Sequence, residues 1–134
     1  SLASVCDFAS RSSTNSDLSA WKKTGVKYVL NGRTKQQMPH FYQFHEDFVQ
    51  NKERLNIQFA AKKITIPHLI IHGDKDTSIS VTEAEKLHAW NPKSVLKIIE
   101  NANHVFNVSH PWTEKKCSEA FEKTIKICID FLSQ

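Results

Sequence analysis

The segment from Pro67 to Gly73 constrains the fold more than any other part of the chain. It reads Pro-His-Leu-Ile-Ile-His-Gly, a short apolar run that begins after a proline and ends at a glycine. A continuous run of this kind is typical of a parallel strand that is buried on both faces. We therefore expect these residues to form a strand inside a sheet that is covered by helices.

The residues that follow alternate between helical and strand patterns. Ser80 and Glu83 form a capping box, which opens a helical pattern that ends before Pro92. A second apolar run, Val95 to Ile99, predicts another strand, and Cys117 to Leu132 predicts a closing helix. The apolar stripe expected on that helix consists of Phe121, Ile125, Cys128 and Leu132. The order strand, helix, strand, helix predicts an α/β fold with a parallel sheet and right-handed crossovers.

The first half of the chain has a different character. Residues 9–20 are rich in Ser, Thr and Asn, and Val26 to Leu30 before Asn31-Gly32 predicts a strand that enters a tight hairpin turn. Two helices are expected next, over about 39–51 and 53–62. The first would present Phe41, Phe44 and Phe48 on one face. These aromatic side chains either pack against the layer below or roof an apolar substrate pocket, and both readings stay open.

Composition limits the class of protein. The 134 residues, 40% of them hydrophobic and 24% charged, suffice for one modest core. The start at Ser1 lacks the basic segment of a signal peptide, and no apolar stretch approaches the roughly 20 residues of a membrane span. The odd trio Cys6, Cys117 and Cys128 forms no disulfide framework, so we expect a cytoplasmic protein. The net charge of +4 comes from lysines scattered among acids, which does not favour nucleic-acid binding.

Two residues that can carry chemistry follow the two predicted core strands. Asp76 comes just after the first strand, and His104 lies on the loop after the second. In open α/β sheets, ligands and catalytic groups gather at the carboxyl ends of the strands. Because neighbouring strands lie about 4.8 Å apart, groups on their outgoing loops can meet. We therefore expect a hydrogen bond between Asp76 and His104.

These segments resemble the last part of α/β-hydrolases of the esterase, lipase and peptidase type. The resemblance rests on Pro67 to Gly73, the Gly73-x-x-Asp76 spacing and the Ala102-Asn103-His104 loop, and it covers residues 64–134. It implies that Asp76 is the acid and His104 the general base of a catalytic triad, in the chain order of that family. It also implies an α/β-hydrolase parallel sheet with flanking helices and a cap or lid insertion.

One part of the family pattern is missing. The nucleophile of these enzymes sits in a Gly-x-Ser-x-Gly elbow, whereas the glycines of this chain are Gly25, Gly32 and Gly73, no two of them four residues apart. One donor of the oxyanion hole is the amide after the nucleophile, so the hole should be missing too. We therefore expect a C-terminal portion that is inactive alone. Residues 1–8 would end a core strand, 9–63 would form the cap, and 64–134 the C-terminal core segment.

The same residues allow other interpretations, which their spacing disfavours. Asp74 is a rival acid on the same loop, but the spacing favours Asp76. A calcium loop over residues 74–85 is disfavoured because Ile79 stands where the turn requires glycine. His68 and His72 lie about 13 Å apart along a strand, too far for one zinc ion, so they are expected to be core histidines. No metal or cofactor is expected.

The leading hypothesis is a serine hydrolase acting on a small or medium carboxylic ester, with a peptide bond as the other substrate. The alternative is a non-catalytic fragment of this fold that serves as a binding or assembly module. Leu2–Phe8 should present an unpaired strand edge. We expect either the N-terminal half of the same hydrolase or a second copy of the chain to dock along that edge.

Overall fold

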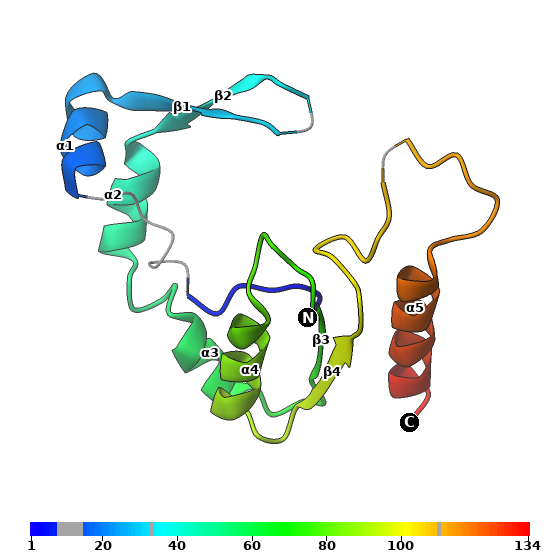
Figure 1. Ribbon diagram of the computed structural model, residues 1–134. Helices are drawn as coiled ribbons and strands as arrows, with labels where there is room; N and C mark the ends of the chain where they lie inside the picture. Colours follow the sequence, from blue (N-terminus) through cyan, green and yellow to red (C-terminus); the bar gives the residue numbers. More distant parts are fainter. Residues whose placement is uncertain (8–14, 33, 110) are drawn as a thin grey trace. The chain divides into compact units, whose positions relative to one another are not determined.

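A computed structural model describes residues 1–7, 15–32, 34–109 and 111–134 (Figure 1). The chain divides into two compact units. The first consists of Ser1–Asp7 and Ile57–Gln134, and the second is Phe8–Asn56. The second unit is therefore an insertion in the chain between two segments of the first.

The sheet of the first unit contains two parallel strands, β3 (Leu69–Gly73) and β4 (Val95–Ile99). They pair in register from Leu69 opposite Val95 to Gly73 opposite Ile99, which confirms the predicted strands and their parallel direction. On the opposite edge of β3, Leu2 forms a parallel bridge with Ile71. Within the expected strand 1–8, the pairing is confined to Leu2, and Phe8 lies outside the described residues.

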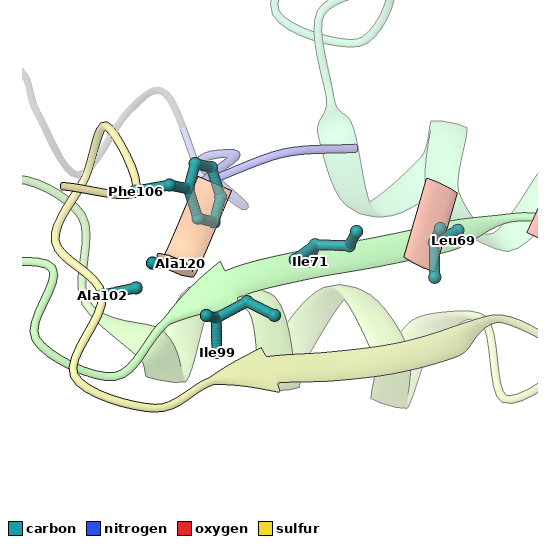
Figure 2. Close-up of a cluster of buried hydrophobic side chains, with 6 residues drawn as sticks. All are labelled: Leu69, Ile71, Ile99, Ala102, Phe106 and Ala120. Atoms are coloured by element: carbon teal, nitrogen blue, oxygen red, sulfur yellow. The ribbon is translucent and has the colours of Figure 1, made fainter. Parts of the chain in front are cut away.

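Helices cover both faces of this sheet. Ile70 packs in one cluster with α3 (Ile57–Lys63) and α4 (Val81–Trp90). Leu69 and Ile71 point into a second cluster with α5 (Glu119–Leu132), shown in Figure 2. Successive side chains of a strand point to opposite faces, so α4 and α5 lie on opposite sides of the sheet. The predicted order of strand, helix, strand and helix is confirmed.

The caps of α4 and α5 explain where these helices begin. The hydroxyl of Ser80 accepts a hydrogen bond from the Thr82 amide, and that of Ser118 accepts one from the Phe121 amide. The Glu83 carboxylate accepts a bond from the Cys6 amide at 2.9 Å. The predicted capping residue Ser80 is thus confirmed, and Glu83 ties the N-terminal segment to α4.

The apolar stripe predicted on α5 is wrong in part. Ile125 is 41% exposed and Leu132 is 82% exposed. Phe121 and Cys128 of the predicted stripe do pack against the core, and the other side chains of α5 that meet it are Ala120, Thr124, Ile127 and Phe131. Isoleucines at 125, 127 and 129 make the helix apolar on several faces, so packing against the sheet selected the face. The small side chains of Ala120 and Thr124 occupy the buried positions.

The second unit contains a helix, a hairpin and another helix. They are α1 (Asn15–Thr24), the antiparallel strands β1 (Val26–Leu30) and β2 (Gln37–Phe41), and α2 (Gln43–Gln50). The strand Val26–Leu30 is confirmed, but the tight turn at Asn31-Gly32 is wrong. The connection runs over residues 31–36, and the Asn31 amide donates to the Gln36 carbonyl at 2.9 Å.

The helix predicted over about 39–51 begins later than expected. Phe41 ends β2, where it pairs with Val26, so it does not share a helical face with Phe44 and Phe48. The Trp21 indole donates to the His40 carbonyl at 2.7 Å, which helps to hold this segment extended. Pairing between distant residues therefore overrode the local helical spacing. The helix expected over 53–62 is also shorter, because α3 begins only at Ile57.

Candidate active site

The loop after β3 holds the Asp76 carboxylate in one orientation. Its Oδ1 atom accepts hydrogen bonds from the amides of Ser78 and Ile79, both at 2.8 Å. The side chain of Asp76 is 0% exposed. An aspartate that bonds the amides two and three residues ahead closes a compact turn. The hydrogen bonds within its own loop are therefore enough to orient the carboxylate.

Gly73 lets the acid loop and the histidine loop lie directly against each other. A Cβ atom at Gly73 would overlap the carbonyl group of Ala102. The Lys75 amide donates to the Ala102 carbonyl at 3.0 Å, and the Asp74 amide donates to the Ile99 carbonyl at 3.1 Å. Only glycine allows so close an approach of two backbones. The glycine of the Gly-x-x-Asp spacing thus positions the neighbouring loop as well as its own.

Two asparagines shape the loop that carries His104. Asn103 Oδ1 accepts from the amides of Val105 at 3.0 Å and Asn107 at 2.8 Å, and Asn107 Oδ1 accepts from the Asn103 amide at 3.0 Å. Asn107 also adopts a positive φ of 63°, a conformation that asparagine tolerates well. These hydrogen bonds between the two asparagines and the loop were not predicted from the sequence, although asparagines on both sides of His104 could have indicated them.

Asp76 and His104 meet at the carboxyl ends of β3 and β4. His104 Nδ1 lies 2.9 Å from Asp76 Oδ2, so the hydrogen bond expected between them is present. An ionised carboxylate can only accept, which assigns the hydrogen to Nδ1 and leaves the lone pair of the neutral ring on Nε2. The ring is 42% exposed while the carboxylate is buried. A basic nitrogen can thus meet a reactant from solvent while its partner is shielded.

Electrostatics keep the buried carboxylate ionised. Burial raises the pKa of Asp76 and is the largest single effect. Hydrogen bonds from the Ile79 amide, the His104 ring and the Ser78 amide act the other way, together with the charge of His104. Their sum holds the pKa of Asp76 below its ordinary value of 3.8. At neutral pH the carboxylate is therefore the charged partner of His104.

His72 is the third side chain of the site. It belongs to β3, is fully buried, and places Nε2 2.9 Å from the Ile79 carbonyl oxygen. The same nitrogen lies 3.2 Å from Asp76 Oδ2. The expectation of a core histidine is confirmed for His72, but it is wrong for His68, which precedes β3, is half-buried and lies within hydrogen-bonding distance of the Ser1 hydroxyl. The closeness of His72 to Asp76 was missed, because a strand residue and a loop residue four positions later need not converge.

The other predicted residues lie elsewhere or engage other groups. The rival acid Asp74 lies 3.8 Å from the Lys75 ammonium, and Asp76 is the carboxylate that contacts His104. Phe41, Phe44 and Phe48 all belong to the second unit, and their substrate-binding role stays a prediction. Within the parts of the chain that the structure describes, no group of three or more His, Cys, Asp or Glu side chains is arranged to hold a metal ion. No helix there is long and apolar enough to cross a bilayer.

Comparison with known proteins shows the fold. No protein-family model matches the chain, and a search of curated proteins also found no match. Among solved structures, Est1E from Butyrivibrio proteoclasticus superposes with a TM-score of 0.50 at 13% identity, over 80% of this chain and 38% of that protein. The esterase domain of a Rhodothermus marinus protein gives a TM-score of 0.46 at 18% identity, over 79% of this chain and 42% of that domain.

The architecture is that of a mixed α/β protein with an α/β-hydrolase-like fold. It combines a parallel pair of strands between helices with an antiparallel hairpin in the second unit. The chain spans about two fifths of the length of the two solved structures.

Proposed function

We propose that this chain is the C-terminal portion of a serine hydrolase that cleaves carboxylic esters, with His104 as general base and Asp76 as its acid partner. The observation that carries the proposal is the 2.9 Å contact between His104 Nδ1 and the buried Asp76 carboxylate. It lies where two parallel strands end, the edge at which α/β proteins assemble their reactive groups. The two similar solved structures are named as an esterase domain and as Est1E, and these names are consistent with a carboxylic ester as the substrate.

The geometry supports a role for each of the two residues in the proposed reaction. His104 Nε2 would take the proton of a serine hydroxyl while the serine oxygen attacks the ester carbonyl carbon. The same proton would then pass to the leaving alcohol, which leaves an acyl-enzyme. In the second half of the reaction, His104 would deprotonate a water molecule whose oxygen attacks the acyl carbon, and the proton would pass to the serine oxygen as the serine–acyl bond breaks and the carboxylic acid leaves. Asp76 would hold the Nδ1–H tautomer and stabilise the imidazolium without accepting the proton.

The serine and the oxyanion hole would come from residues ahead of this chain. The 134 residues contain no Gly-x-Ser-x-Gly elbow, and they span only 38% and 42% of the two solved structures. We expect no hydrolysis by this chain alone. Leu2 is 50% exposed, and among the described residues its strand pairing is with Ile71, so the preceding strand or a second copy would pair along its other side.

Substrate choice would depend on the second unit. Its side chains Phe41 and Phe44 are exposed, and with Phe48 they would supply the apolar surface of a cap. This surface, rather than the Asp76–His104 pair, would decide between an ester and a peptide bond.

The three free cysteines, Cys6, Cys117 and Cys128, support a cytoplasmic location.

Labelling with a fluorophosphonate probe tests the proposal in the whole protein that carries this chain. We expect labelling of the unsubstituted protein, loss of labelling in His104→Ala and a strong decrease in Asp76→Asn. Asp74→Asn is the matched control, because Asp74 lies on the same loop and pairs with Lys75. Absence of label on the unsubstituted protein, or full labelling of His104→Ala, would overturn the proposal. An alanine or glycine at the nucleophile position would instead support the non-catalytic binding module.

A further inference from the structure

His72 contacts two residues of the loop that holds the acid, and the proposed reaction assigns it no role. Its Nε2 atom lies 2.9 Å from the carbonyl oxygen of Ile79 and 3.2 Å from Asp76 Oδ2. The side chains of His72 and Asp76 are both 0% exposed. A polar ring is thus buried directly behind the carboxylate that His104 contacts from the solvent side.

The contacts assign the hydrogen of the His72 ring. A carbonyl oxygen can only accept, so the nitrogen that faces Ile79 must donate, and Nε2 carries the hydrogen. The positive end of this N–H bond also lies beside Asp76 Oδ2, the atom that accepts from His104. Oδ2 therefore sits between two imidazole rings.

The other nitrogen of His72 argues against a role in packing alone. Nδ1 is buried, and among the described residues it has no hydrogen-bond partner. A buried polar atom without a partner costs free energy, so Nδ1 does not account for a histidine at this position. The contacts that the His72 ring makes through its polar atoms are those of Nε2–H.

We propose that His72 is a positioning residue that orients the Asp76 carboxylate toward His104. Ile79 provides the link, because its amide donates to Asp76 Oδ1 while its carbonyl accepts from His72. His72 thereby fastens the turn to β3 and keeps Oδ2 directed at His104 Nδ1. The inference rests on the proposed function only in so far as His104 acts as a base, whereas the geometry of the three side chains is independent of it.

Histidine tautomers, measured by long-range ¹H–¹⁵N correlation spectra of the whole protein, test the geometry without any reaction. We expect His72 as the Nε2–H form and His104 as the Nδ1–H form. In His72→Phe, which removes the donor and keeps a planar ring, the His104 Nδ1 proton should resonate further upfield and exchange faster with water. In His72→Gln, whose amide reaches about as far as Nε2, both effects should be largely reversed.

Ester hydrolysis by the same variants tests the consequence for catalysis. A misplacement of about 1 Å costs up to roughly a hundredfold in rate, so His72→Phe should lower kcat about ten- to hundredfold with KM changed less than about twofold. The kcat of His72→Gln should stay within about threefold of the unsubstituted value, because the glutamine amide keeps a hydrogen-bond donor at the place of Nε2.

Two results would overturn the inference. One is an Nδ1–H tautomer for His72 in the unsubstituted protein. The other is a folded His72→Phe variant that keeps both the His104 resonance and kcat. If His72→Phe does not fold, the tautomer of the unsubstituted protein and the His72→Gln variant decide. Failure of the proposed function appears separately, as absence of probe labelling in the unsubstituted protein.

Discussion

Gly73→Ala should damage both the fold and the site, and its cost can be worked out from the structure. The added Cβ would overlap the Ala102 carbonyl group and lie 2.7 Å from its carbon atom. Hydrogen bonds from Lys75 to Ala102 and from Asp74 to Ile99 hold the two backbone segments together. Neither segment can move away from the other without breaking one of these hydrogen bonds. Overpacking costs about 1–3 kcal/mol, and the rigid backbone here favours the upper end. One lost hydrogen bond adds about 1 kcal/mol.

The free energy of unfolding should therefore fall by about 3–4 kcal/mol, which denaturant titration of the whole protein would measure. A shift of the His104 loop by about 1 Å should also lower ester hydrolysis by up to roughly a hundredfold in the surviving folded protein. Gly32→Ala is the matched control, because a Cβ there meets nothing within 4 Å. A Gly73→Ala protein within 1 kcal/mol of the control would refute the close approach of the two loops.

Three further predictions concern the site and its supports. Because the folded pKa of Asp76 lies below its ordinary value of 3.8, the ionised carboxylate stabilises the fold above that pH, and this contribution is lost as the pH falls through the folded pKa. The difference in unfolding free energy between the unsubstituted protein and Asp76→Asn should shrink as the pH falls below about 4, and a difference that grows in that range would contradict this sign. Asn103→Ala removes the acceptor of two loop amides and should cost about 1–3 kcal/mol, whereas Asn103→Asp, which keeps the acceptor, should cost less in the same denaturation assay. Ser118→Ala removes both the acceptor of the Phe121 amide and the donor to the Phe106 carbonyl oxygen, and should lower the thermal midpoint with a loss of about 1–2 kcal/mol, while Ser118→Thr, which keeps the hydroxyl, should retain most of the stability.

The arrangement of the site explains why one small region carries so many constraints. Gly73 brings the two loops together, and the turn at Asp76 fixes the carboxylate. Hydrogen bonds of Asn103 and Asn107 shape the loop of His104. Each device is short and local, yet the contact at 2.9 Å exists only because β3 and β4 are adjacent and parallel. Supporting residues of this kind usually determine how precisely a reactive pair is held.

Local patterns in the sequence were enough for the elements that surround the site. The apolar run at Leu69–Gly73, the cap at Ser80 and the run at Val95–Ile99 each encode their element within a few residues. Because parallel strands place their outgoing loops at one edge, the order of these elements also predicted that Asp76 and His104 would meet. These features depend on neighbours in sequence and on general topology, so they were readable without coordinates.

Other features were decided only by contacts between residues far apart in the chain. The buried face of α5 followed from which small side chains fit against the sheet, since isoleucines made more than one face apolar. Phe41 became a strand residue because Val26 pairs with it, against its local helical spacing. The place of His72 behind Asp76 depended on how the loop after β3 folds back onto the strand. Sequence periodicity records local preference, whereas these choices depend on which surfaces fit when the chain packs, and that information exists only in the folded protein.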